Sequence, residues 1–204
     1  MTELNNFINR FQFTLPTTRQ PVFKAGKSAA VLLPIINKPH PTLLLTQRSP
    51  FLRSHAGEVA FPGGASDPED GSPINTALRE AYEEVAIPPE KVKVLGQLAP
   101  LQSYGGYEVT PIVGLLPNNI RYQANPSEVA SIFEVPLFDA LSLQRHKFVD
   151  IKRSGRHSRI FFYWYNGRLV WGLTASIIHQ LALQLDWAFH NYSPYSAVIT
   201  VWYF

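Results

Sequence analysis

Apolar residues gather in short runs along the chain, and most of these runs predict β-strands. The runs at 29–35 (AAVLLPI) and 42–48 (TLLLTQR) are rich in aliphatic side chains and flank a proline-rich turn, as two neighbouring strands do. Further strands are predicted at 92–101, 107–116, 128–137, 159–165 and 168–172. Strands and helices do not alternate regularly, so the pattern favours a mixed sheet over a doubly wound parallel fold.

Helical spacing of apolar residues is confined to a few segments. Residues 1–15 predict a short amphipathic helix, residues 137–143 a brief helical stretch, and residues 174–190 a longer amphipathic helix. Another helix is predicted to begin at Ser72 and Pro73, because an N-cap hydroxyl is followed by proline at the first helical position. Two consecutive prolines after Ile87 end it.

The helix that begins at Pro73 has two predicted faces. The apolar face recurs at spacings of three and four and is expected to pack on the sheet; it consists of Leu78, Ala81, Tyr82 and Val85. The opposite face is acidic and consists of Glu80, Glu83 and Glu84. Glu80 and Glu84 are like charges one turn apart with no lysine between them, which costs about a few tenths of a kcal/mol unless a cation is present.

Two interpretations of the acidic face are open at this point. Three glutamates on a helix are often simply a solvated surface. Alternatively, they hold a hard divalent cation such as Mg²⁺ or Mn²⁺, which favours several carboxylate oxygens. Gly63 and Gly64 favour the second interpretation, because they allow a tight turn and a close approach of the backbone just before this face.

Composition narrows the class of protein. A chain of 204 residues, 46% of them hydrophobic, suits one domain with extensions. The net charge of +3 suits a phosphate-bearing small molecule, and the chain lacks the dense basic stripe of a nucleic-acid binder. With no cysteine and no close histidine pair, any metal site is expected to be oxygen-ligated.

The ends of the chain and its hydropathy predict where the protein works. The first residues lack the order of a secretory signal, and no apolar run is long enough to span a bilayer. We therefore expect a cytoplasmic protein without a membrane partner. The sequence leaves the oligomeric state open.

The acidic stretch resembles the Nudix box. Its usual form is glycine, five residues, Glu, seven residues, then Arg-Glu, an apolar residue, any residue, Glu-Glu, any residue, glycine and an apolar residue. Residues 79–85 (REAYEEV) match the helical half position by position. Three positions depart from the pattern: Asp70 stands in place of Glu, eight residues separate it from Arg79, and Ala86 replaces the usual glycine.

The preceding segment narrows the resemblance. Residues 44–64 (LLTQRSPFLRSHAGEVAFPGG) resemble the signature of the coenzyme A pyrophosphatase branch of Nudix hydrolases. The matching positions are Leu44, Leu45, Thr46, Arg48, Ser49, Arg53, Gly57, Phe61, Pro62, Gly63 and Gly64. Segments 106–114 (GYEVTPIVG) and 170–178 (VWGLTASII) also resemble that branch, so the resemblance covers about residues 28–185. It implies an N-terminal extension at 1–27, a Nudix domain at 28–185 and a C-terminal extension at 186–204.

The resemblance implies a fold and a reaction. The fold would be the Nudix α/β/α sandwich with a mixed β-sheet. The reaction would be metal-dependent hydrolysis of the diphosphate bond of coenzyme A or its thioesters, giving 3′,5′-ADP and 4′-phosphopantetheine or its acyl form. The cofactor would be Mg²⁺ or Mn²⁺.

The resemblance also implies roles for individual residues. Glu80 and Glu84 would bind the metal, and Glu83 would be the third ligand or a base acting through water. Arg79, counted with the catalytic residues, would hold Asp70 in an ion pair. Substrate contacts would come from the signature segment, at Arg48, Arg53, His55, Gly63 and Gly64.

Further acids and aromatic residues are weaker candidates. Glu108 and Glu128 would be additional metal ligands. Tyr104, Tyr107 and the aromatic run at 161–165 would either stack on adenine or belong to the core. A second basic cluster would either meet the same anion or only raise the isoelectric point; it comprises Lys147, Lys152, Arg153, Arg156, His157 and Arg159.

Two alternative functions stay open on the sequence alone. One is a Nudix hydrolase of another nucleoside diphosphate derivative, such as NADH or ADP-ribose. The other, suggested by the three departures in the box, is a nucleotide-binding Nudix domain without activity.

Overall fold

The structure is a computed structural model that describes residues 3–13, 26–153 and 156–191. Side chains at 153–157 and 186–191 are outside the description. Most of the N-terminal extension predicted at 1–27 and most of the C-terminal extension predicted at 186–204 also lie outside the described residues. The domain boundaries therefore stay a prediction.

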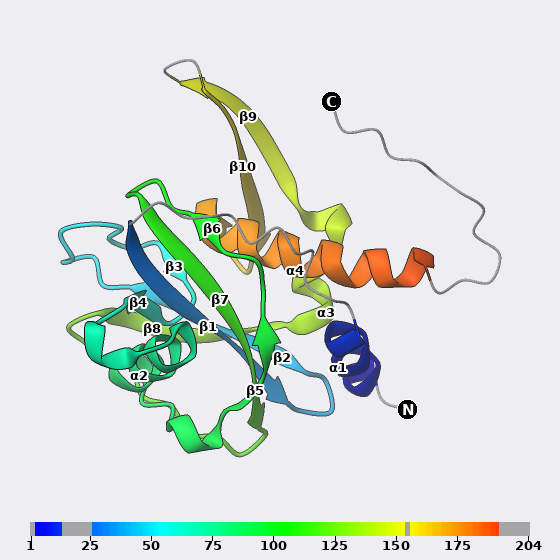
Figure 1. Cartoon of the computed structure of the whole chain (residues 1–204), viewed down its shortest axis with the longest axis horizontal. Coiled ribbons are helices and arrows are strands. Elements are labelled where there is room, and N and C mark those ends of the chain that lie inside the picture. The colour runs from blue at the N-terminus through cyan, green and yellow to red at the C-terminus, as the bar shows by residue number, and fades with distance from the viewer. Residues whose placement is uncertain (1–2, 14–25, 154–155, 192–204) are drawn as a thin grey trace.

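A mixed sheet forms the middle of the molecule (Figure 1). Its main path runs β3-β2-β1-β7-β5, with β4 paired to β1, β6 to β7 and β8 to β2. The long strands β1 and β7 are parallel, and every other pair in this sheet is antiparallel. The strands are β1 (Lys27–Asn37), β2 (Thr42–Arg48), β3 (Val59–Ala60), β4 (Gly63–Ala65), β5 (Lys93–Gln97), β6 (Leu101–Gln102), β7 (Tyr107–Pro117) and β8 (Val129–Pro136).

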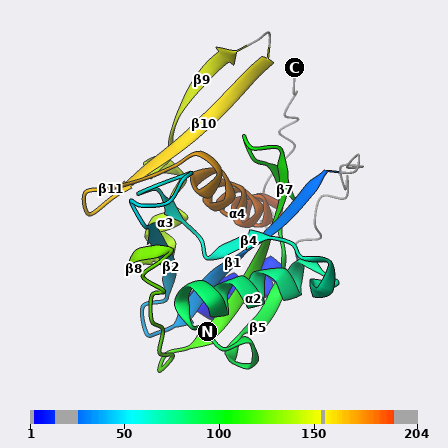
Figure 2. The ribbon, with the colours of Figure 1, turned by 90° about the vertical axis from the view of Figure 1, so that its left-hand side faces the viewer.

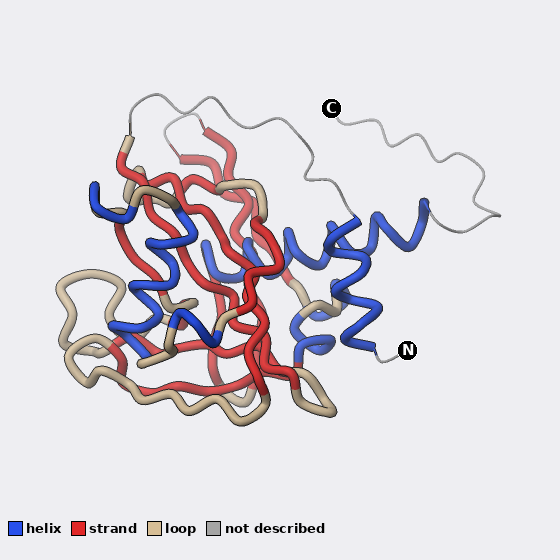
Figure 3. Tube along the Cα trace, turned by 60° about the horizontal axis from the view of Figure 1, so that its bottom comes forward, coloured by secondary structure: helices blue, strands red, loops and turns tan. Residues whose placement is uncertain are grey.

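Helices cover both faces of this sheet (Figure 3). Alternate residues of β1 point to opposite faces, so Leu32 packs with α2 while Leu33 packs with α1 and α4. Burial on both faces explains why β1 is an almost continuous apolar run. The helices are α1 (Glu3–Phe13), α2 (Pro73–Val85), α3 (Leu137–Ala140) and α4 (Gly172–Asn191), with short 3₁₀ turns η1 (Pro68–Asp70), η2 (Pro89–Lys91) and η3 (Leu143–Arg145). The predicted α/β/α sandwich is confirmed.

No helix in the described part of the chain is long and apolar enough to cross a membrane.

A second sheet of three antiparallel strands, in the order β11-β10-β9, extends beyond the central sheet (Figure 1). Its strands are β9 (Lys147–Arg153), β10 (Arg156–Tyr165) and β11 (Arg168–Trp171). The sequence predicts β10 and β11 but not β9, which carries part of the second basic cluster. One face of the sheet packs on α4, where the Phe161 ring stacks on His179 with 4.0 Å between centroids.

The helix α2 begins where the sequence places it. Ser72 is its N-cap, and the Ser72 hydroxyl accepts a hydrogen bond of 3.2 Å from the backbone N–H of Asn75. The helix packs through small side chains, because Ala77 and Ala81 lie against Ala30 and neighbouring residues of β1 and β7. Small residues at this contact let the helix approach the sheet closely.

The predicted burial of α2 is wrong at two positions. Tyr82 was expected on the sheet, yet 56% of its surface is exposed, whereas Glu84, expected on the open face, is only 3% exposed. The narrow gap over Ala77 and Ala81 leaves no room for a tyrosine ring. Glu84 instead enters a position where polar groups of β4 and β2 surround its carboxylate.

The helix ends in a conformation that explains why glycine is usual at the position of Ala86. Ala86 is the C-cap, with φ 54° and ψ 33°, and its backbone N–H bonds the carbonyls of Ala81 and Tyr82. This left-handed position favours glycine, because a Cβ there crowds the following carbonyl oxygen. An alanine at this position therefore strains the end of the helix.

We expect Ala86→Gly to raise the free energy of unfolding by about 1 kcal/mol, since it removes the left-handed strain at the cap. Urea denaturation measures the change. The matched control is Ala77→Gly in the helix interior, which should lower the free energy of unfolding. A destabilised Ala86→Gly variant would contradict the strain at this cap.

Candidate active site

Arg79 ties the loop before α2 to the helix itself. Its Nε donates to Asp70 Oδ1 at 2.8 Å and its Nη2 to Asp70 Oδ2 at 3.0 Å, a two-pronged contact. The Asp70 carboxylate, 9% exposed, also accepts from the Thr76 hydroxyl and the Asp67 backbone N–H. The hydrogen bond from Arg79 holds the pKa of Asp70 well below its usual range, against the opposing effect of burial.

Arg79 also contacts the acidic face of α2 and strand β4. Its Nη1 lies 3.0 Å from Glu80 Oε1 and 3.3 Å from Glu83 Oε2, and its Nη2 donates to the carbonyl of Ala65 at 3.1 Å. One guanidinium thus joins the loop acid, strand β4 and two glutamates of α2. Asp70, one methylene shorter than the usual Glu, reaches Arg79 directly because η1 brings it beside the helix.

The glycine pair lies directly against the glutamates. A Cβ added to Gly64 would sit 2.5 Å from the Glu80 carboxylate, so a larger residue there would displace this carboxylate from its present position. Gly63 is equally confined, since a Cβ there would lie 2.4 Å from the carbonyl oxygen of Ala30. The Gly63 backbone N–H donates to Glu84 Oε2 at 3.2 Å. The two glycines therefore position the backbone of β4 against the acidic face.

Glu84 is a buried carboxylate with few partners. Burial raises the pKa of Glu84 to about 7, against smaller opposing effects from the Gly63 N–H and from Arg48, whose Nη1 lies 3.7 Å from Glu84 Oε1. The neighbouring charges of Glu128 and Glu80 raise it further. The surroundings of Glu84 therefore hold too little positive charge to keep this carboxylate fully ionised at neutral pH.

Glu80 shares this environment. Burial raises the pKa of Glu80, Arg79 lowers it, and the charges of Glu83 and Glu128 raise it again. Glu128 comes from the loop before β8, where its carbonyl accepts from the Ser49 backbone N–H at 2.7 Å. The charge of Glu128 therefore acts on both Glu80 and Glu84, whereas only burial raises the pKa of Glu108; both Glu128 and Glu108 stay predictions as metal ligands.

The acidic face fits a hard divalent cation by its chemistry. In the described part of the chain, no three acidic or histidine side chains are grouped closely enough to hold a metal ion, and Glu80 and Glu84 contact Arg79 and Arg48. The donors are nevertheless all oxygens, the buried ones have raised pKa values, and Gly64 leaves a cradle in which the Glu80 carboxylate lies. Glu80 and Glu84, with Glu83 or Glu128, are the residues that would hold the ion.

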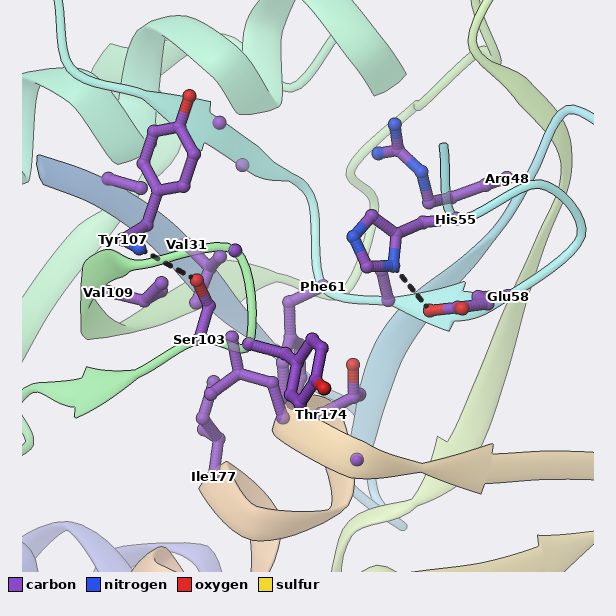
Figure 4. Close-up of a pocket in the computed structure, with 18 of the residues that line it drawn as sticks. Val31, Arg48, His55, Glu58, Phe61, Ser103, Tyr107, Val109, Thr174 and Ile177 are labelled. Carbon is purple, nitrogen blue, oxygen red and sulfur yellow. Dashed lines mark hydrogen bonds and ion pairs between the residues drawn. The ribbon is translucent and has the colours of Figure 1, made fainter. Parts of the chain in front are cut away.

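A cavity of about 450 Å³ adjoins this face (Figure 4). One wall is polar and comes from β2 and the loop after it, with Arg48, His55 and Glu58. The opposite wall is mainly apolar and comes from β1, β7 and the start of α4, including Val31, Val109 and Ile177. Gly63 and Gly64 also line the cavity, so it opens beside the glutamates.

The predicted substrate residues divide into two groups. Arg48, His55, Gly63 and Gly64 line the cavity, whereas Arg53 is exposed on the loop and does not line it. Tyr104 and Tyr107 line the cavity as well, and Tyr163 is buried in the main core.

The second basic cluster lies apart from the cavity. Among its members with described side chains, Arg159 pairs with Asp150 on the β9–β10 hairpin, with Nε 2.7 Å from Oδ1. None of those members lines the cavity.

The sequence missed several cavity residues. Glu58 occupies an unspecified position inside the signature, and Ser103 and Thr174 reach the cavity only through the folding of distant segments. The signal that could have found the last two is the resemblance of segments 106–114 and 170–178 to the same branch, since both border or enter the cavity wall.

The mixed sheet, the buried glutamate of α2 and the adjoining polar cavity wall agree with what the comparisons with known proteins show. The NUDIX domain family matches residues 26–153, so the chain belongs to the Nudix hydrolase family. The prediction of a Nudix hydrolase is therefore confirmed. Members of this family generally use divalent metal ions and act on small nucleotide-derived substrates.

Individual relatives are similar over nearly the whole chain. The uncharacterized Nudix hydrolase NudL of Photorhabdus laumondii is 62% identical over 186 residues, covering 91% of this chain and all of that protein. The protein of the same name in Yersinia enterocolitica is 56% identical, covering 90% of this chain and 93% of its own. Among solved structures, a MutT/nudix family protein from Enterococcus faecalis aligns with a TM-score of 0.49 at 14% identity, covering 89% of this chain and 73% of that one.

The raised pKa of Glu84 predicts how stability changes with pH. Folding moves this pKa from an ordinary 4.5 up to about 7, so the folded state holds the proton more tightly than the unfolded state. The metal-free protein should lose stability as pH rises from about 4.5 to 7, by an amount on the order of 3 kcal/mol from this group. Glu84→Gln should flatten that loss and be more stable than the parent at pH 8.

Urea denaturation in a chelator at several pH values measures this effect, and Glu90→Gln, at an exposed carboxyl on η2, is the matched control. Added Mg²⁺ should stabilise the parent more at pH 8 than at pH 6, because the cation competes with the proton. An unchanged pH slope in Glu84→Gln would show that this carboxylate is not the cause.

Proposed function

We propose that the protein hydrolyses the diphosphate bond of coenzyme A or its thioesters, giving 3′,5′-ADP and 4′-phosphopantetheine or its acyl form, with Mg²⁺ or Mn²⁺ as cofactor. One observation carries the proposal. The three segments that resemble the coenzyme A pyrophosphatase branch, at 44–64, 106–114 and 170–178, are far apart in sequence, yet residues of all three line one cavity. That cavity adjoins the acidic face of α2.

The shape and polarity of the cavity support such a substrate. Coenzyme A has a highly charged nucleotide end and a long, weakly polar pantetheine arm. The wall with Arg48 and His55 suits phosphate oxygens, and the wall with Val109 and Ile177 suits the arm. A volume of about 450 Å³ holds part of this substrate, so the remainder would extend into solvent.

Hydrolysis requires a water oxygen to bond one phosphorus while the bridging P–O bond breaks and the water gives up a proton. Arg48 is placed to neutralise phosphate oxygens, because its Nη1 lies at the boundary between Glu84 and the cavity. Glu83, with a side chain 53% exposed and 3.3 Å from Arg79 Nη1, would accept the proton directly or through another water. The backbone of Gly63 and Gly64 lets the diphosphate approach the acidic face closely.

A bound divalent ion would supply charge neutralisation on the diphosphate oxygens and would orient the attacking water. Glu80 and Glu84 would hold it, and their raised pKa values show that they are short of positive charge without it. Arg79 would not touch the substrate; its contacts with Asp70 and Glu80 make it a positioning residue.

The structure supports an active enzyme despite the altered box. Asp70 makes the contact expected of the usual glutamate, and the extra residue is accommodated in the loop and η1 before Ser72. Ala86 lies beyond the last glutamate and changes only the helix end. None of the three departures removes a carboxylate from α2.

The direct test is incubation of the full-length protein with coenzyme A and Mn²⁺, followed by chromatography. We expect 3′,5′-ADP to form, with Glu84→Gln reducing kcat by a factor of about 100 or more while the fold is retained. The same assay with NADH and ADP-ribose ranks substrates by kcat/KM. A higher kcat/KM for either would redirect the assignment within the family, and coenzyme A binding without turnover of any nucleotide would favour a non-catalytic domain.

The cradle at Gly64 gives a separate prediction. Gly64→Ala places a methyl group against the Glu80 carboxylate, so kcat should fall about tenfold or more through misplaced carboxylate oxygens. Gly105→Ala is the matched control, because Gly105 also lines the cavity but its added Cβ would meet nothing closer than 3.7 Å. Equal activity of the two variants would contradict the role of the cradle.

A further inference from the structure

His55 and Glu58 form a pair at the cavity wall that the mechanism above does not use. His55 Nδ1 lies 3.0 Å from Glu58 Oε2, and both residues line the cavity. With Nδ1 directed to the carboxylate, the ring presents its other nitrogen, Nε2, to the cavity (Figure 4). A protonated imidazole donates from both nitrogens, so Nε2–H is available to a ligand.

The backbone holds this pair in a defined position. Arg48 N–H donates to the Glu58 carbonyl at 2.9 Å, and Glu58 N–H donates to the His55 carbonyl at 3.3 Å, so the loop is closed against β2. His55 has φ 56°, in the left-handed region that costs a residue other than glycine about 1–2 kcal/mol.

The stability of the pair does not account for this geometry. The side chains of His55 and Glu58 are 62% and 33% exposed, and exposed ion pairs contribute about 0–1 kcal/mol. That gain does not exceed the cost of the left-handed backbone. Strained residues of this kind occur preferentially at ligand sites, where binding makes use of the enforced orientation.

His55 and Glu58 contact each other on the wall of the cavity, whereas the Glu84 carboxylate contacts Gly63 and Arg48. Arg48 lies between the two regions, because it contacts Glu84 and also lines the cavity on the same side as His55 (Figure 4). An anionic group bound at His55 would therefore be separate from the diphosphate at the glutamates.

We propose that His55, oriented by Glu58, forms with Arg48 a subsite for a phosphate monoester that the substrate carries in addition to its diphosphate. His55 would be a specificity-determining residue, and Glu58 would act only by positioning the imidazole. The inference rests on the proposed function, and it names the 3′-phosphate of coenzyme A as the group recognised. Two donors on one wall suit a doubly charged phosphate. A substrate without this phosphate would leave both donors without a partner.

The test compares coenzyme A with 3′-dephospho-coenzyme A, which share the diphosphate and the pantetheine arm. The parent should prefer coenzyme A in kcat/KM by about tenfold or more. His55→Asn, chosen because asparagine tolerates the left-handed backbone, should remove most of this preference through KM for coenzyme A and leave dephospho-coenzyme A within about twofold. His40→Gln, at an exposed histidine away from the cavity, should leave the preference unchanged.

Glu58 is tested through its dependence on His55. Glu58→Ala should lower the preference, Glu58→Gln should retain more of it because the amide oxygen still accepts from Nδ1–H, and the double variant with His55→Asn should equal His55→Asn alone. A preference that rises in Glu58→Ala would show that Glu58 merely repels phosphate, and additive losses would show that it acts independently of His55.

Failure of this inference is distinguishable from failure of the proposed function. Equal turnover of the two nucleotides by the parent protein would overturn the phosphate subsite and leave the proposed hydrolysis intact. If neither nucleotide is hydrolysed, calorimetric binding of each to the full-length protein decides. Tighter binding of coenzyme A that is lost in His55→Asn would retain the subsite, and equal binding would overturn it.

Discussion

The contact between Arg79 and Asp70 is the interaction on which the rest of the site depends. The chain must pass from β4 through an irregular loop and return in α2 with its carboxylates facing the backbone of the glycine pair. Arg79 fixes that path, because it bonds Asp70 in the loop, the Ala65 carbonyl in β4 and Glu80 on the helix at once. Asp70 is buried while Arg79 is partly exposed, so loss of Arg79 would leave a buried carboxylate without its main partner.

Close packing of α2 on the sheet stabilises the fold but also buries the Glu84 carboxylate. The helix α2 lies beside β1 and β4 (Figure 2). Ala77 and Ala81 bring it near the sheet, and this closeness buries Glu84 beside Gly63 and Arg48. Burial without a full complement of partners raises the pKa of Glu84 to about 7. The same packing that stabilises the fold therefore leaves a carboxylate that binds a proton or a cation readily. A bound divalent cation would meet this need.

The sequence predicts most of this fold because its signals are local. The aliphatic run of β2, the Ser72 cap of α2 and the long amphipathic spacing of α4 are each specified by neighbouring residues. The exposure of Tyr82 and the burial of Glu84 are not local properties, since they depend on how closely the helix meets the sheet.

Some residues of the site can likewise be predicted from a short stretch of sequence, and others depend on contacts between distant segments. The motif supplies the glutamates, Arg48 and the glycines, because a fixed spacing can be read along the chain. Glu58 was missed because its importance lies in one side-chain contact with His55, and Thr174 because α4 reaches the cavity only in the folded molecule.

The central claim is that buried carboxylates of α2, held by Arg79, form a cation site that opens into the cavity of the coenzyme A signature. The most direct measurement is a crystal structure of the full-length protein soaked in Mn²⁺, with the ion located by its anomalous scattering. The account predicts an ion bound by Glu80 and Glu84 at the edge of the cavity lined by Gly63 and Arg48. An ion bound only elsewhere on the molecule, or no ion at millimolar Mn²⁺ and pH 8, would contradict it.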